Sequence, residues 1–288
     1  MHLTAITDEI SMDFAHALDV MAEYGCKSAE LRSLWDTNIA DLTPEQLDEA
    51  QRILDRKGFQ VCCLASPLYK CELGSTTSSG AVGRTHQATA RTADEQLDLL
   101  KHLAAVAKRF GTPYIRIFSF WKRGDLSPEI ETAIAEGISD GVKFAEDTGV
   151  VLLMENEHAC YLGTGVETAR FVERINSPAL KAVWDPGNAF LAGEKPFPDG
   201  YEAIKSHVAH VHVKDAELLA SGKKRFVVVG EGEVDYPRQL AALKSDGYDG
   251  YISLETHYRP FAGTPEQGSR LCLQALNKMF EDAGVGGR

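Results

Sequence analysis

The feature of this sequence that most limits its possible folds is a hydrophobic pattern that changes repeatedly along the chain. Short apolar runs rich in β-branched residues alternate with longer amphipathic segments, which predicts eight strands that are each followed by a helix. The predicted strands are residues 2–7, 28–31, 59–65, 114–118, 150–155, 180–184, 210–213 and 251–254. The predicted helices are residues 13–24, 44–57, 92–110, 128–148, 166–175, 201–206, 236–245 and 265–282.

Strands that alternate with helices pair in parallel, because each helix carries the chain back to the start of the next strand. Eight such units in 288 residues predict a closed (β/α)₈ barrel, or TIM barrel, that forms one domain over residues 1–288. The apolar runs VVLLM (150–154) and FVVV (226–229) fit strands that are covered on both faces. A doubly wound open sheet is the alternative, but the sequence lacks the glycine-rich phosphate loop that usually follows its first strand.

The formal net charge of −12 argues against a nucleic-acid partner, whose phosphates must be neutralised by lysine and arginine. The densest basic cluster is KKR at residues 223–225; because Gly222 precedes it, we predict a hairpin turn with a solvated tip. The sequence has no run of about 18 apolar residues, which a membrane span would need, and it does not begin like a secretion signal. Its six cysteines form no C-x-x-C motif and no disulfide framework, so the expected location is the cytoplasm.

Polar side chains follow the predicted strands, at the rim where the active site of a barrel lies. Strands five to eight lead into or carry ENEH (155–158), DPGN (185–188), HVHVKD (210–215) and ETH (255–257). Each motif alone has a plain explanation, such as a helix cap, a turn residue or a core histidine. Together, four consecutive strands bring metal-binding side chains to one rim, where several buried carboxylates would need a cation. Carboxylates with one imidazole suit Mn²⁺ first, with Mg²⁺, Co²⁺ and Zn²⁺ as alternatives.

Five motifs together resemble the sugar phosphate isomerase/epimerase superfamily, the xylose isomerase-like barrels. They are MENEH (154–158), WDPGN (184–188), HVHVKD (210–215), GEGEVDY (230–236) and SLETH (253–257), and the resemblance covers nearly the whole chain. It implies that one divalent metal ion is bound by Glu155, Asp185, His212 and Glu255. His212 is preferred to His210 because the family's ligand histidine lies three residues before the aspartate of an H-x-x-D stretch.

The sequence departs from this family pattern in two places. Many ketose epimerases and the endonuclease IV-type members have a histidine three residues after the strand-six aspartate, where this chain has Asn188. The endonucleases also need an Asp-x-His pair after strand seven, but Asp215 is followed by Ala216 and Glu217. A three-metal DNA-repair site is therefore not expected.

The resemblance implies an isomerase or epimerase that acts on a sugar, keto sugar or related polyol through a metal-stabilised enediolate. Glu155 and Glu255 would then be acid/base residues as well as ligands, one removing a substrate proton and the other returning it. Loss of a β-hydroxyl from the same enediolate would make the protein a lyase, of the inosose-dehydratase or dehydroshikimate-dehydratase kind. A sugar-binding barrel with only a structural metal is the non-enzymatic alternative.

Several further side chains near the rim are candidates for binding this small carbohydrate substrate. Lys214 and Arg116 could hold an anionic group, and Trp121 could provide an apolar wall for a sugar ring. The other candidates are the hydrogen-bonding side chains of Asn188, His158 and His257. Each has an equally simple structural interpretation, for example a pair between Lys214 and a rim carboxylate. The long loop at residues 69–91 is expected to cover the rim, and the family makes a homo-oligomer plausible.

Overall fold

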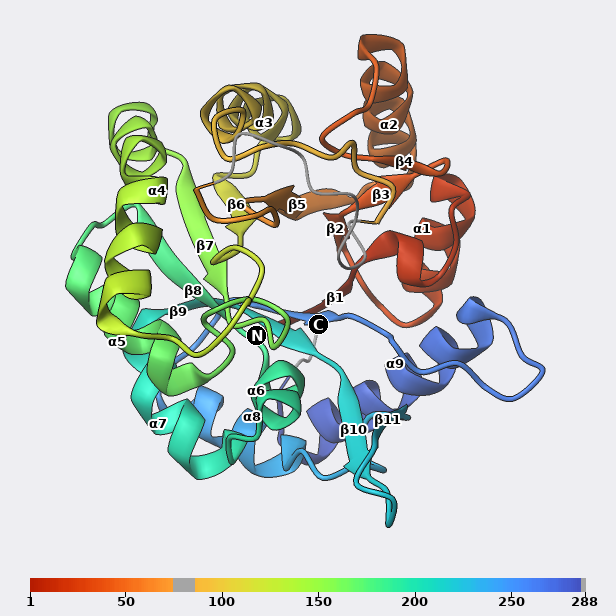
Figure 1. Ribbon diagram of the computed structural model, residues 1–288. Helices are drawn as coiled ribbons and strands as arrows, with labels where there is room; N and C mark the ends of the chain where they lie inside the picture. The colour runs from red at the N-terminus through yellow and green to blue at the C-terminus, as the bar shows by residue number, and fades with distance from the viewer. Residues whose placement is uncertain (75–85, 286–288) are drawn as a thin grey trace.

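The computed structural model describes residues 1–74 and 86–285, in which helices surround a central sheet (Figure 1). Eight parallel strands are hydrogen-bonded in the order β1-β12-β9-β8-β7-β6-β5-β2. Their bounds are β1 His2–Ala5, β2 Ser28–Leu31, β5 Gln60–Leu68, β6 Tyr114–Ile117, β7 Val151–Glu155, β8 Leu180–Trp184, β9 Val208–Val213 and β12 Tyr251–Leu254.

The two ends of this sheet meet at strands β1 and β2. A parallel bridge connects Ile6, just after β1, with Glu30 of β2, and Thr4 Oγ1 donates a hydrogen bond to Ser28 O at 2.8 Å. These contacts between β1 and β2 close the sheet into a barrel. The prediction of a TIM barrel is confirmed, and the doubly wound sheet is excluded.

The helices follow the strands along the chain and form the outer layer of the barrel. Their bounds are α1 Phe14–Glu23, α2 Pro44–Lys57, α3 Gln96–Phe110, α4 Pro128–Thr148, α5 Gly165–Ile175, α6 Pro186–Ala192, α7 Tyr201–Ile204, α8 Tyr236–Ser245 and α9 Pro265–Asp282. The predicted capping box of α2 is present, since Thr43 Oγ1 accepts from Gln46 N while the Gln46 side chain accepts from Thr43 N. The large apolar core contains side chains of both layers, such as Leu18, Ile134 and Leu152.

The structure adds elements that the sequence analysis missed. Helix α6 begins directly at Pro186, whereas the analysis predicted the helix after β8 only at residues 201–206. A small hairpin of β3 (Ser33–Leu34) and β4 (Thr37–Asn38) follows β2. Both were missed because they are shorter than the windows in which hydrophobic periodicity can be recognised.

Several predicted boundaries differ by one or two residues, and the two largest errors are in β5 and α3. Strand β5 continues to Leu68, three residues beyond the predicted end, and α3 begins at Gln96 and not at residue 92. The predicted loop at residues 69–91 is described only in part, because its STTSSG segment (75–80) lies outside the described residues.

The predicted hairpin after β9 is present, as β10 (Asp215–Leu218) and β11 (Lys224–Val227), and it projects from the barrel (Figure 1). The FVVV run at residues 226–229 is therefore not a barrel strand, so its interpretation as a strand covered on both faces was wrong. It is apolar because Val229 packs into the main core at the base of the hairpin. At the tip Lys223 is exposed as predicted, but Lys224 is partly buried and donates to the carbonyl oxygens of Phe190 and Leu191 in α6.

All six cysteines are buried and unpaired, in agreement with the expected absence of a disulfide framework. Among the described residues, no helix is both long enough and apolar enough to cross a bilayer. The single-domain extent over residues 1–288, the cytoplasmic location and the homo-oligomer stay predictions.

Candidate metal centre

Four side chains of types that can bind a metal meet at the carboxyl ends of the last four barrel strands. Glu155 ends β7, His212 lies in β9, and Asp185 and Glu255 directly follow β8 and β12. Each offers one ligand atom, and these atoms all lie within 4.8 Å of one another. All four residues are buried, and even the most accessible, Glu255, is only 4% exposed. The strands of a parallel barrel end at one rim, so neighbouring strands bring together residues that are far apart in sequence.

Asp185 has two roles in this arrangement. Its Oδ1 atom caps helix α6 by accepting a hydrogen bond from Asn188 N at 2.8 Å, while Oδ2 lies 2.7 Å from Lys214 Nζ. Gly187 in the first turn of α6 allows the backbone of Lys214 to lie close to this helix, because a Cβ atom at position 187 would lie 2.4 Å from Lys214 O. The DPGN motif therefore serves both as a helix start and as a support for the rim.

Three cationic side chains offset the charge of these carboxylates. Lys214 Nζ lies 2.7 Å from Asp185 Oδ2 and 2.5 Å from Glu255 Oε2. Arg116 Nη1 lies 3.2 Å from Glu155 Oε2, and Arg32 Nη1 donates to Glu255 Oε1 at 2.8 Å. Arg116 and Lys214, predicted as substrate anchors, are thus already engaged with the candidate ligands. The simpler interpretation of both, a pair with rim carboxylates, describes their contacts in this structure.

The electrostatics of the centre follow from burial and from this dense charge. Burial disfavours ionisation of Glu255, but Lys214, His257 and His212 outweigh it and hold the pKa of Glu255 well below its usual value. Burial also lowers the basicity of His212, yet the neighbouring Glu30 and Glu155 raise its pKa to about 10. The pKa of Asp185 is raised, because burial and the charges of Glu155 and Glu255 outweigh Lys214. His212 therefore carries a proton at neutral pH that a metal ion would have to displace.

The residues present fit a divalent cation. Glu155 Oε2 and Asp185 Oδ2 are buried, and each lies beside a cationic side chain, Arg116 at 3.2 Å and Lys214 at 2.7 Å. A carboxylate oxygen has two lone pairs, so each can face a metal ion in the cluster while it keeps its ion pair. Carboxylate oxygens with one imidazole nitrogen form a donor set that Mn²⁺, Mg²⁺, Co²⁺ and Zn²⁺ all accept. The structure therefore has groups positioned for a metal ion, whose identity these residues alone do not determine.

Asn188 and His158 form a chain of hydrogen bonds that ends on Glu155. Asn188 Nδ2 donates to Glu155 Oε1 at 3.1 Å, and Asn188 Oδ1 lies 2.9 Å from His158 Nδ1. That nitrogen also lies 3.0 Å from Glu157 Oε1. Asn188 is fully buried, whereas 42% of the His158 side chain is exposed. Of the two, His158 is thus the more accessible to a substrate.

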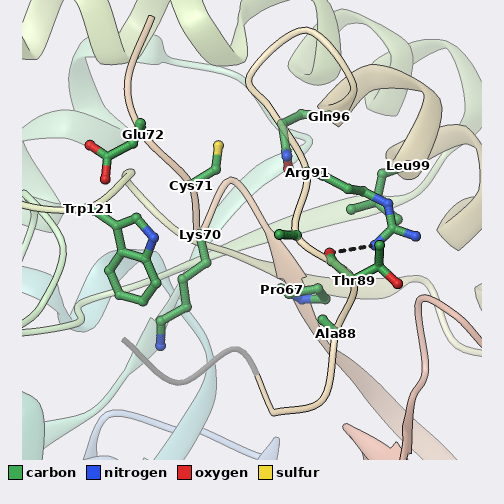
Figure 2. A pocket seen from close by; sticks show the side chains of 11 residues that line it. Pro67, Lys70, Cys71, Glu72, Ala88, Thr89, Arg91, Gln96, Leu99 and Trp121 are labelled. Carbon is green, nitrogen blue, oxygen red and sulfur yellow. Dashed lines mark hydrogen bonds between the residues drawn. The ribbon is translucent and has the colours of Figure 1, made fainter. Parts of the chain in front are cut away.

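Trp121 lies beside Lys70, at a small cavity of about 40 Å³ (Figure 2). Lys70 Nζ lies 5.3 Å from the centre of the Trp121 ring and 3.4 Å from Glu157 Oε2. This cavity is far smaller than the several hundred Å³ typical of small-molecule sites. It therefore gives no support to Trp121 as the wall of a sugar site.

A larger cavity, of about 390 Å³, is lined by Arg32 and His257, which both contact the candidate ligand Glu255, and its size fits a small-molecule site. His257 lies on its wall, with Nε2 3.6 Å from Glu255 Oε2 and with Phe226 stacked on its ring. The lining residues are Asp8, Glu9, Met12, Arg32, His86, Gln87, His257 and Arg259.

Arg32 is the most important residue of this cavity that the sequence analysis did not select. It is 2% exposed, and besides Glu255 it donates to Asp8 Oδ2 at 3.0 Å and to Glu9 Oε1 at 2.6 Å. It directly follows β2, so the strand-end rule places it at the rim, although it was not selected there as a site residue. Lys70 was missed because the predicted end of β5 came three residues too early.

Asp215 explains two of the sequence motifs without taking part in the metal cluster. Its carboxylate accepts backbone hydrogen bonds from Gly230 at 2.8 Å and from Gly232 at 3.0 Å. A Cβ atom at Gly232 would lie 2.2 Å from Asp215 Oδ1, so this position requires glycine. The aspartate of H-x-x-D therefore holds the GEGEVDY loop, and Tyr236 of that loop in turn donates to Lys214 O at 2.7 Å.

A protein-family model described as the xylose isomerase-like TIM barrel matches residues 18–279. The chain belongs to this family. The resemblance found in the motifs is confirmed, and the family's barrel is the fold described above.

Individual members of the family are only distantly similar. An inosose dehydratase of Lacticaseibacillus casei is 25% identical over an alignment of 148 residues, and the match covers 45% of this chain and 49% of the relative. The chain thus spans about half the length of the curated relatives it matches. The IOLI protein with a bound zinc atom has a TM-score of 0.75 at 18% identity, covering 98% of this chain and 99% of the other. The 3-keto-D-glucoside 4-epimerase of E. coli has a TM-score of 0.68 at 15% identity, covering 96% and 99%.

Proposed function

We propose that this protein is a divalent-metal-dependent isomerase or epimerase of a keto sugar or related polyol. The observation that carries the proposal is the convergence of Glu155, Asp185, His212 and Glu255 at one buried rim. A cavity of about 390 Å³ is lined by Arg32 and His257, which both contact Glu255, and we propose that a small polar substrate approaches the rim from this side. Two structural neighbours support the proposal, since one is named 3-keto-D-glucoside 4-epimerase and the other, the IOLI protein, contains zinc. We propose Mn²⁺ as the first ion to test, with Mg²⁺, Co²⁺ and Zn²⁺ after it.

The bound ion would supply Lewis-acid stabilisation of the negative charge that develops on a substrate carbonyl oxygen. Glu155 and Glu255 come from strands β7 and β12, and each would have a carboxylate oxygen that can exchange a proton with the substrate. One would remove a proton next to the carbonyl group, and the other would return a proton to the same carbon or to its neighbour. Lys214, buried between Asp185 and Glu255, would stabilise the enediolate with its positive charge.

The cavity wall would select the substrate by its hydroxyl groups. His257 and His86 line the cavity and offer hydrogen-bonding ring nitrogens. His158 lies at the rim and reaches Glu155 through Asn188. We propose that these side chains orient a polyhydroxylated substrate, whereas Arg116 acts by holding Glu155. The buried polar groups favour a substrate whose hydroxyl groups satisfy them.

Elimination of water is the second candidate reaction. Curated relatives that match this chain are named inosose dehydratase, although each match covers about half of their length. The same enediolate would lose water, and the protein would be a dehydratase, if a hydroxyl group leaves from the next carbon. Lys214 or a protonated glutamate would then supply the proton to the departing oxygen.

Deuterium exchange in D₂O tests the proposal and separates its two forms. We expect the protein loaded with Mn²⁺ to incorporate deuterium next to the carbonyl group of a substrate in a panel of keto sugars and keto polyols. Exchange with the carbon skeleton intact and no loss of water supports an isomerase or epimerase. Exchange accompanied by stoichiometric loss of water identifies a dehydratase. A metal-loaded protein that produces neither across the panel contradicts both and leaves a sugar-binding barrel with a structural metal.

A further inference from the structure

Below the candidate ligands, one carboxylate in the barrel interior meets two histidines of a distant strand. Glu30 of β2 is fully buried, and so are His210 and His212 of β9. His210 Nε2 lies 2.9 Å from Glu30 Oε2, and His212 Nε2 lies 3.0 Å from Glu30 Oε1. Strands β2 and β9 are not neighbours, since β1 and β12 lie between them around the barrel. The Glu30 side chain therefore makes these contacts across the interior.

This contact determines where the protons of the two imidazole rings lie. An ionised carboxylate accepts hydrogen bonds and does not donate them, so the Nε2 atoms of His210 and His212 must be the donors. The other nitrogen of the His212 ring, Nδ1, lies 3.3 Å from Glu155 Oε1 and 3.9 Å from Glu255 Oε2. Glu30 thus contacts one ring nitrogen of His212, Nε2, while the other, Nδ1, faces the candidate ligands Glu155 and Glu255.

We propose that Glu30 is a positioning residue for the metal centre, which keeps His212 protonated on Nε2 and directs Nδ1 toward Glu155 and Glu255. This inference rests on the metal centre of the proposed function, but not on the reaction. His210 contributes by donating a second hydrogen bond to the same carboxylate, and its ring meets that of His212 at 81° with centroids 5.3 Å apart. A carboxylate that accepts from the distal nitrogen of a ligand histidine fixes the orientation of the ring and increases its affinity for a metal.

The first test is the affinity of the protein for Zn²⁺, measured by competition with a chelator. We expect Glu30→Gln to weaken Zn²⁺ binding about 10- to 100-fold, because glutamine cannot accept from both histidines with equal strength. Ser253→Ala is the matched control, since Ser253 is a buried β12 residue paired in register with His212 and its Oγ atom has no partner among the described residues. It should leave the affinity unchanged. Equal affinities for Glu30→Gln and wild type would overturn the inference.

The second test needs no variant, so it stands even if Glu30→Gln does not fold. In the wild-type protein loaded with Zn²⁺ and labelled with ¹⁵N at histidine, NMR should show His212 with its proton on Nε2 and the metal on Nδ1. A proton on Nδ1 would overturn the inference. Neither test uses a substrate, so a protein that binds Zn²⁺ as expected but has no turnover contradicts the proposed reaction alone.

Discussion

Replacing Glu255 by glutamine is expected to lower turnover by about 10²- to 10⁴-fold, the usual contribution of a general acid or base. Glutamine keeps the size of the side chain and one oxygen that can bind a metal, but it cannot take up or release a proton. Glu255 belongs to the candidate metal centre and contacts Arg32 and His257, which line the larger cavity. Glu155→Gln is expected to have an effect of the same order.

Deuterium exchange with the substrate found for the wild-type protein measures this effect, with the metal content of each variant determined on the same sample. The matched control is Glu202→Gln, since Glu202 is an exposed glutamate of α7 that pairs only with the surface side chain of Lys205 among the described residues. Full turnover by Glu255→Gln with its metal still bound would show that Glu255 is not an acid/base residue.

Replacing Arg32 by methionine is expected to destabilise the protein by about 3–5 kcal/mol, the cost of removing one partner from a buried ion pair. The Arg32 guanidinium is 2% exposed and lies between three carboxylates, those of Asp8, Glu9 and Glu255. Arg259 still pairs with Glu9 at 2.9 Å in the variant, but Asp8 loses the cation that faces it. Methionine fills a similar volume, so the loss of stability would come mainly from removal of the positive charge.

Urea unfolding of the metal-free proteins measures the free energy of unfolding of this variant. Arg52→Met is the matched control, because Arg52 is 67% exposed and pairs with Glu49 on the surface of α2. Surface pairs of this kind contribute at most about 1 kcal/mol. If Arg32→Met were no more destabilising than Arg52→Met, the buried cluster would not depend on Arg32 as the structure indicates.

The barrel could be predicted from the sequence because each of its units carries a strong local signal. Helices α2 and α8 were predicted with the observed bounds, since Pro44 and Tyr236 follow clear capping residues and the helices are long enough to show their period. Helix α6 has only seven residues, which is too short for such a signal. Local pattern therefore predicted the barrel units and the hairpin after β9, but not the shorter elements α6 and β3–β4.

The sequence also identified the residues that meet at the rim, because the ends of parallel strands come together in any barrel of this type. It offered Lys214 as a partner of a rim carboxylate, but it could not show the contacts that cross the barrel interior. Arg32 reaches Glu255 over 223 positions of sequence, and Glu30 reaches His212 over 182. Such contacts depend on side-chain directions across the barrel interior, which no local pattern in the sequence encodes.

The most direct test of the metal centre is elemental analysis of the purified protein and its Asp185→Ala variant, each incubated with Mn²⁺ and then freed of unbound ion. Asp185 contributes a buried carboxylate to the four candidate ligands, so its removal should open the ligand set. We predict about one metal ion per wild-type chain and loss of that ion in the variant. A wild-type protein that binds no ion, or a variant that binds as much as wild type, would contradict the assignment of Glu155, Asp185, His212 and Glu255 as a metal centre.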